Sequence, residues 1–112
     1  MSYQNRINAI PLTTLAATGF NNSLQVLNAG LPAACVLLRI VNGTNMEVGI
    51  SYNGVTINDA ILSGGQLELN FQSNALPNNY TAMIAKGTPV YAIGAAAGTG
   101  FVYLAAYYLP EV

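Results

Sequence analysis

The residue types that most often carry out catalysis are scarce in this chain. Histidine is absent and Cys35 is the sole cysteine, so the commonest general base and the commonest zinc ligands are missing. The carboxylates are Glu47, Asp59, Glu68 and Glu111. A glycoside hydrolase needs two carboxyl groups across a cleft, and the spacing identifies no such pair. We therefore predict that the protein is not an enzyme and has no catalytic, cofactor-binding or metal-binding residue and no cofactor.

The charge of the chain excludes further classes of partner. Arg6, Arg39 and Lys86 are the only basic residues, and the net charge is -1. Binding to a phosphate backbone needs clusters of basic residues, so we expect no nucleic-acid partner. The sequence contains neither an apolar run of about 18 residues nor the apolar core of a secretion signal. We accordingly expect no association with a membrane. We expect the protein to be made in the cytoplasm of the host.

The composition favours permanent contact with a partner. Only 6% of the residues are charged and 53% are hydrophobic, whereas about 25% charged is typical of a soluble domain. Much of the surface must then be neutral, supplied by Asn, Gln, Ser and Thr. Such a surface loses little ionic solvation when it is buried against another protein.

Hydrophobic periodicity indicates β-strands from residue 34 onward. Apolar residues occupy every second position in residues 46–52 and 66–71, which predicts strands with one buried and one more polar face. Residues 35–41 are apolar except for Arg39, as expected of an inner strand.

Turn sequences separate these runs and predict three strand pairs. Residues 42–45, Asn-Gly-Thr-Asn, are expected to join the strands on either side as a hairpin. The dipeptide Asn53-Gly54 favours a two-residue type I′ turn leading directly into the next strand. Residues 88–93 and 101–108 are expected to pair around the Ala- and Gly-rich connection between them.

The number of short strands and turns defines the expected fold class. Residues 12–18 are compatible with a strand, and residues 23–28 with a strand or one helical turn. We predict an all-β single domain, a β-sandwich or jelly-roll-like fold of about seven to nine short antiparallel strands. Residues 1–20 would form an N-terminal arm or a first edge strand, and residues 21–112 the β-sandwich domain.

The last strand raises the question of what covers its second face. Alternation in residues 101–109 sends Phe101, Tyr103, Tyr107 and Leu109 to the face opposite Val102, Leu104 and Ala106, and a two-layer sandwich buries only one such set. The N-terminal segment could fold back over the remaining face, or another subunit could cover it. We favour assembly, with a homotrimer as the first guess. The predicted interface residues are Phe101, Tyr103, Tyr107, Leu109, Tyr3 and Ile7.

The tyrosines permit a second interpretation. Aromatic rings together with amide side chains suit the CH groups and hydroxyls of sugars, but they also serve as interface anchors. The residues in question are Tyr52, Tyr80, Tyr91, Tyr103, Tyr107 and Tyr108. A carbohydrate-binding β-sandwich module therefore stays open as an alternative.

About two-thirds of the chain resembles small virion structural proteins of tailed bacteriophages. The resemblance lies in strand and turn patterns, namely CVLLRIVN (35–42), VGISYNGV (48–55), KGTPVY (86–91) and GTGFVYL (98–104). Many such proteins are capsid decoration or cement proteins, and others lie at the head-tail junction or in the tail. The resemblance implies a compact β-sandwich or jelly roll that oligomerises.

From the resemblance we expect a location on the outer capsid surface of a virion. The expected function is a non-enzymatic cement protein that oligomerises there, stabilises the capsid and has the major capsid protein as its partner. A head-tail junction or tail component remains the alternative within the same class.

Overall fold

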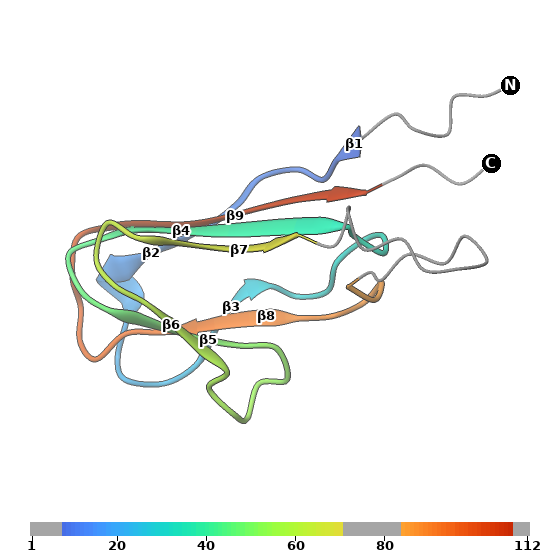
Figure 1. Cartoon of the computed structure of the whole chain (residues 1–112). Coiled ribbons are helices and arrows are strands. Elements are labelled where there is room, and N and C mark those ends of the chain that lie inside the picture. Colours follow the sequence, from blue (N-terminus) through green and yellow to red (C-terminus); the bar gives the residue numbers. More distant parts are fainter. Residues whose placement is uncertain (1–7, 71–83, 109–112) are drawn as a thin grey trace, which may run out of the picture.

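The alternating apolar residues organise the chain into two antiparallel sheets packed face to face (Figure 1). The computed structural model describes residues 8–70 and 84–108. Within these ranges it contains one short 3-10 turn, Ala17–Gly19, and nine strands. The strands are β1 (Asn8–Ala9), β2 (Thr13–Ala16), β3 (Gln25–Asn28), β4 (Leu37–Thr44), β5 (Val48–Ser51), β6 (Asp59–Ile61), β7 (Gln66–Asn70), β8 (Val90–Ile93) and β9 (Gly100–Tyr108).

The strand order is that of a jelly roll. In the first sheet, sheet A, β1 and β2 pair with one edge of β9, and β4 and then β7 follow on its other side. The second sheet, sheet B, has the order β3-β8-β5-β6. From β2 to β9 the chain changes sheet at every step except between β5 and β6, and this alternation between two four-stranded layers is how jelly rolls are built. The predicted all-β jelly-roll-like class is thus confirmed.

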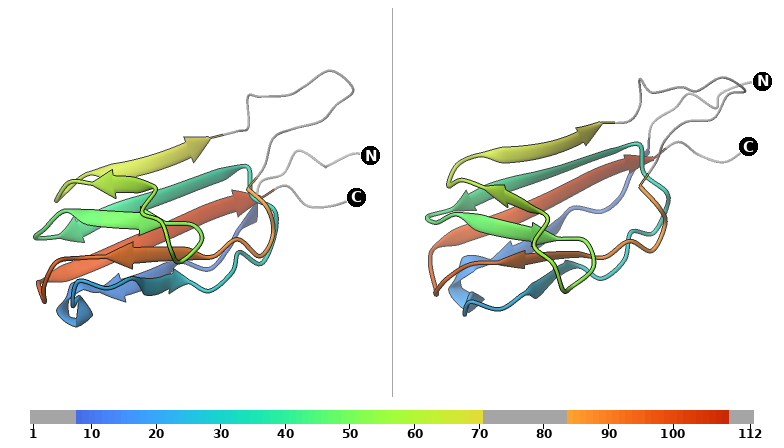
Figure 2. Two further views of the ribbon diagram at one scale, coloured as in Figure 1. Left: turned by 90° about the horizontal axis from the view of Figure 1, so that it is seen from below. Right: turned by 60° about the horizontal axis from the view of Figure 1, so that its bottom comes forward.

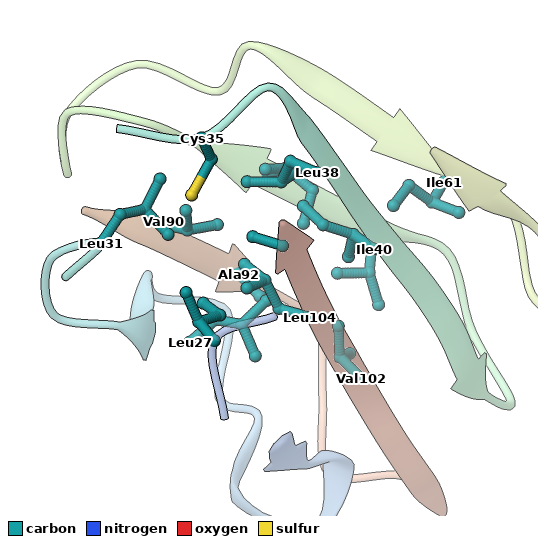
Figure 3. Close-up of a cluster of buried hydrophobic side chains, with 14 of the residues drawn as sticks. Leu27, Leu31, Cys35, Leu38, Ile40, Ile61, Val90, Ala92, Val102 and Leu104 are labelled. Atoms are coloured by element: carbon teal, nitrogen blue, oxygen red, sulfur yellow. The ribbon is translucent and has the colours of Figure 1, made fainter. Parts of the chain in front are cut away.

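The core lies between the two sheets and takes one face of each strand. In β4 and β9 every second side chain points inward, so that Leu38, Ile40 and Leu104 are fully buried. Figure 3 shows them facing Val90 and Ala92 of β8. Burying each large aliphatic side chain stabilises the fold by roughly 1.5–3 kcal/mol relative to exposure, so this layer of side chains holds the sheets together.

A buried asparagine links the two sheets at one end of the sandwich. The Nδ2 group of Asn42 donates to the carbonyl oxygens of Met46 and Ile61, both at 2.8 Å. Its Oδ1 atom accepts from the backbone N–H and the hydroxyl of Thr44. Because an unpaired buried amide is costly, this set of bonds specifies where the chain leaves sheet A for sheet B.

The predicted pairing of consecutive strands is wrong in two places, for one reason. The turn at residues 42–45 does not form a hairpin, because β4 lies in sheet A and β5 in sheet B. The late strands also do not pair, because β8 belongs to sheet B and β9 to sheet A. Turn sequences indicate that the chain reverses, but they do not indicate which layer it enters.

The turn at Asn53-Gly54 also differs from the prediction. β5 and β6 do form a hairpin, with Ile50 opposite Asp59, but residues 52–58 form a wide loop between them. Among the described residues other than glycine, Asn22 alone has a positive φ, so Asn53 does not adopt the type I′ conformation. Its Oδ1 atom instead accepts from the N–H groups of Val55 and Thr56, both at 2.9 Å. This side-chain turn replaces the backbone turn.

Candidate assembly surface

The outer face of sheet A carries an apolar stripe along β9 and β4. Four rows of cross-strand partners make up the stripe, because paired residues in an antiparallel ladder project on the same side. The rows are Tyr107 with Leu37, Ala105 with Arg39, Tyr103 with Val41, and Phe101 with Gly43. Three of the six predicted interface residues, Phe101, Tyr103 and Tyr107, are thereby brought together on one surface.

The two rings at one end of the stripe are the most exposed part of it. Phe101 is 46% exposed and Tyr103 is 36% exposed, and their ring centroids lie 6.2 Å apart in a tilted arrangement. The ring of Tyr103 leans over Gly43, since a Cβ atom built there would lie 3.3 Å from Cε2 of Tyr103. The ring of Tyr103 therefore lies over the bare backbone of Gly43 and stays partly exposed.

Polar residues border the stripe on the side of β7. Gln66 and Glu68 are exposed and stand opposite Val41 and Arg39, respectively. Arg39 and Glu68 are the charged residues of the described outer face of sheet A, and they are cross-strand partners. The surface is thus net neutral: one charged residue, Arg39, lies within an otherwise apolar stripe, and polar residues follow along the β7 edge.

The described part of the N-terminal segment lies beside this face and does not cover it. β1 pairs Ala9 with Tyr107, and β2 pairs Thr14 with Tyr103, as further strands in the plane of sheet A. Leu12, between β1 and β2, is 61% exposed. The predicted interface residues Tyr3, Ile7 and Leu109 lie outside the described residues.

The tyrosines do not gather into one sugar-stacking platform. Tyr103 and Tyr107 lie on the outer face of sheet A, whereas Tyr91 lies on the outer face of sheet B opposite Ser51. Tyr52 and Tyr108 pack against the core. Tyr80 lies outside the described residues, so at most two described tyrosines share the face that carries Phe101.

Sequence reasoning missed how the outer face of sheet B is covered. The loop at residues 52–58 descends from sheet B on the side away from sheet A (Figure 1) and overlies part of it when viewed from below (Figure 2). A Cβ atom on Gly49 would lie within 3.1 Å of side-chain atoms of both Ile57 and Ile93. A Cβ atom on Gly54 would lie 3.0 Å from the ring of Tyr91.

Small residues under the loop are the sequence feature that could have revealed this cover. Gly49 lies mid-strand in β5, where glycine weakens a strand unless something approaches it closely. Ser51 beside it is fully buried, and its Oγ accepts from the N–H groups of Asn53 and Gly54 at 3.3 and 3.0 Å. The loop at residues 52–58 therefore packs on the outer face of β5, the strand that precedes it.

The remaining polar groups do not assemble into a reactive site in the described residues. The buried thiol of Cys35 donates to the carbonyl of Ala33, and burial raises its pKa, which disfavours the nucleophilic thiolate. The hydroxyl of Tyr52 donates to Oδ2 of Asp59 at 3.0 Å. Burial, and then this hydrogen bond and the negative charge of Asp59, raise the pKa of Tyr52. In residues 8–70 and 84–108 no group of three metal-ligating side chains occurs.

Comparison with known proteins identifies no family. No family model and no curated protein matches the chain. Among solved structures, a chain described under "Bacillus endospore appendages form a novel family of disulfide-linked pili" aligns over 99% of this chain and 96% of that chain. The identity is 11% and the TM-score is 0.46, and a likeness at this level carries no functional conclusion.

In the part of the chain that the structure describes, no helix has both the length and the apolar character needed to cross a bilayer.

Proposed function

We propose that this protein is a non-enzymatic structural subunit that assembles through the outer face of sheet A. The observation that carries the proposal is the open apolar stripe on β9 and β4, in which Phe101 and Tyr103 are 46% and 36% exposed. Large apolar patches with a polar rim mark interaction sites on soluble proteins. The other exposed large apolar residues are scattered, because Leu12, Val55, Ile57 and Leu62 lie between strands and Val26 lies in the edge strand β3. The stripe differs from them in running along two central strands.

The assembly proposed is the surface of a bacteriophage capsid, where the protein acts as a decoration or cement protein on the major capsid protein. The jelly-roll architecture, which is also used in viral capsid domains, and the sequence resemblance to small phage virion proteins support this assignment. A low-charge surface suits permanent burial. Attachment of several linked copies would multiply weak individual contacts through effective concentration.

The copy number per particle distinguishes a cement protein from a head-tail junction or tail component. In purified virions, quantitative gel densitometry is expected to show this chain at the abundance of the major capsid protein or at a simple fraction of it. A count of about a dozen or fewer would reject the cement assignment and favour a head-tail junction or tail component, which occurs in few copies.

The attachment surface itself is tested by re-binding to particles that lack the protein. Wild-type protein is expected to saturate such particles, whereas Tyr103→Ser is expected to bind at least about tenfold more weakly, as for a central aromatic anchor. Tyr91→Ser, on the opposite outer face, is the matched control. Equal binding by the two variants would refute the role of sheet A.

Carbohydrate binding is the competing function, because Phe101 and Tyr103 are exposed on the same sheet face as Gln66 of β7, which lies across Val41 from Tyr103. Jelly rolls also serve as lectin domains. It forecasts that soluble oligosaccharides change tyrosine fluorescence with no particle present. A fluorescence change that is lost in Tyr103→Ser but kept in Tyr91→Ser would support sugar binding in place of the structural function. No fluorescence change across a glycan panel would reject the sugar hypothesis.

A further inference from the structure

The dipeptide Asn-Gly occurs twice in the chain, and the fold gives the two copies opposite surroundings. One is Asn42-Gly43 in strand β4, and the other is Asn53-Gly54 in the loop between β5 and β6. Asparagine before glycine is chemically labile, because the next backbone nitrogen can attack the side-chain amide carbon and glycine has no Cβ to obstruct that approach. The two copies share this reactivity, so their surroundings decide which of them reacts.

Asn42 is held through all of its polar groups. It is fully buried, and its side chain makes the bonds at the corner of the sandwich described above. Its backbone N–H donates to the carbonyl of Gly65, and its carbonyl accepts from the N–H of Gly64, both at 2.9 Å. Attack on the amide carbon of Asn42 must therefore wait until this corner opens.

Asn53 is exposed, and hydrogen-bond donors surround its Oδ1 atom. The N–H groups of Val55 and Thr56 donate to it at 2.9 Å, and the hydroxyl of Ser51 donates at 3.0 Å. Negative charge gathers on this oxygen when a nitrogen adds to the amide carbon, and donors aimed at it stabilise that charge. The Oγ atom of Ser51 also accepts from the N–H of Gly54 at 3.0 Å, so an acceptor lies at the proton that the attacking nitrogen must lose.

We propose that Asn53 is the site of a spontaneous modification of this chain, from which the fold protects Asn42. The nitrogen of Gly54 bonds to Cγ of Asn53, the bond from Cγ to Nδ2 breaks, and ammonia leaves with the proton of the Gly54 nitrogen. Water then adds to one of the two carbonyl carbons of the resulting succinimide ring and breaks its bond to nitrogen. Opening at Cγ gives aspartate, whereas opening at the backbone carbonyl gives isoaspartate, whose main chain runs through the former side chain.

The two products act differently on the loop that covers sheet B. An aspartate at position 53 keeps an oxygen in the place of Oδ1, and its charge strengthens the bonds from the N–H groups of Val55 and Thr56. An isoaspartate instead lengthens the main chain by one CH2 group just before Gly54, which packs against the ring of Tyr91. We expect this insertion to lift the loop, so that isoaspartate uncovers part of the outer face of sheet B.

The site lies on the layer opposite the proposed assembly surface. Asn53 follows β5 of sheet B, whereas the apolar stripe runs along β9 and β4 of sheet A. Attachment through sheet A would leave the loop at residues 52–58 in contact with the water that the second step consumes. The modification therefore goes beyond the proposed function and does not depend on it.

Peptide mapping by mass spectrometry, on the full chain incubated at mildly alkaline pH, tests the selectivity. In the folded protein Asn53 is expected to convert at least about tenfold faster than Asn42, because the buried site reacts only from an opened state. The same chain in concentrated guanidinium chloride is the control. Unfolding removes the difference in surroundings, so the two sites should then convert at similar rates.

Two outcomes of the mapping would overturn the proposal. One is conversion of Asn42 as fast as that of Asn53 in the folded protein. The other is a folded protein in which Asn53 stays intact over a time in which the unfolded chain converts.

Amide hydrogen exchange on the isoaspartate form, separated by chromatography, tests the effect on the loop. Exchange at Val55 and Thr56 is expected to be at least about tenfold faster than in the unmodified protein, because loss of protection follows local opening. Asn53→Asp carries the new charge without the added CH2 group, so it is the matched control and should keep the protection. Full protection in the isoaspartate form, or the same loss in Asn53→Asp, would reject the opening of the loop by main-chain insertion.

Discussion

The two outer faces of this sandwich both carry apolar side chains, but they differ in whether a described segment of the chain covers them. On sheet B, the loop at residues 52–58 turns back so that Ile57 packs over Gly49 and Gly54 packs against Tyr91. On sheet A, no described segment lies over the stripe of Phe101 and Tyr103. Apolar outward side chains are covered by the chain itself on sheet B, whereas on sheet A the described residues leave them uncovered.

The difference shows that exposure of apolar residues in a sequence is not by itself a mark of assembly. Val55 and Ile57 are 82% and 54% exposed, yet they belong to the loop that covers sheet B. Scattered apolar residues on a loop are normal for soluble proteins. Four consecutive rows on one sheet face form a continuous surface, and this continuity is what supports the proposed assembly.

The largest effect on stability is expected from a change at the corner that links the two sheets. Asn42→Ala removes the donor to the carbonyls of Met46 and Ile61 and the acceptor for Thr44. Because buried polar groups are left unpaired, the free energy of unfolding should fall by about 2–4 kcal/mol. Urea denaturation measures it, with the exposed Gln66→Ala as control. A loss below about 1 kcal/mol would show that the corner is not held by this amide.

A smaller effect is expected from lifting the cover off sheet B alone. Gly49→Val forces the methyl groups of Ile57 and Ile93 away from the strand, which should cost about 1–3 kcal/mol as overpacking. Amide hydrogen exchange should accelerate at Val55 and Thr56, whose N–H groups are bonded within the loop. Ala60→Val, on the neighbouring strand, should change stability by less than about 0.5 kcal/mol. Unchanged exchange in Gly49→Val would mean that the loop does not depend on this contact.

A matched pair of tyrosines sharpens the contrast between the faces. Tyr91→Ser removes a ring that contacts the loop and should lower the free energy of unfolding by about 1–2 kcal/mol without affecting association. Tyr103→Ser should cost the isolated chain less than about 1 kcal/mol while weakening association. Denaturation and sedimentation of both variants provide the comparison, and reversed outcomes would exchange the roles assigned to the faces.

The smallest effect at neutral pH concerns Tyr52, at the base of the loop. Its pKa is raised by burial, by its bond to Asp59 and by that residue's charge, from a usual value of 10.0. The folded protein therefore keeps a proton that the unfolded chain releases. The free energy of unfolding should be insensitive to this group below about pH 9 and should fall as pH rises past about 10. Denaturant titrations measure this dependence.

Tyr52→Phe should remove that part of the alkaline dependence, and ultraviolet titration should show a tyrosine ionising above the usual pKa in the wild type that is missing in Tyr52→Phe. A Tyr52→Phe profile that coincides with the wild type would contradict the assignment.

Much of the fold is readable in the chain because the sandwich uses strict alternation. The polar exposure of Glu47 and Glu68 and the burial of Val48 and Ile50 follow from period-two patterning, as does the inner position of β4. The strand of residues 35–41 is predicted two residues early, since Cys35 makes only an isolated bridge to Ile84 and β4 begins at Leu37. Strand existence was more predictable than strand ends.

The candidate surface was predictable only in part. That Phe101, Tyr103 and Tyr107 share a face follows from their spacing, but their neighbours on β4, with Gly43 beside Phe101, depend on register. The cover over sheet B was not predictable from Asn53-Gly54, because Asn side chains can hydrogen-bond a wide loop as well as permit a tight turn.

What the sequence by itself determined is therefore local: which residues form strands, which face of each is apolar, and that catalytic side chains are scarce. Only the tertiary structure decided which strands are neighbours, because the turns after Thr44 and before Gly100 could lead the chain equally well into either layer. The layer was set by long-range terms, namely burial of the inward apolar side chains of both sheets in one core and the bond of Asn42 to Ile61 across the corner. Those contacts join residues up to 19 positions apart, so no local pattern could encode them alone.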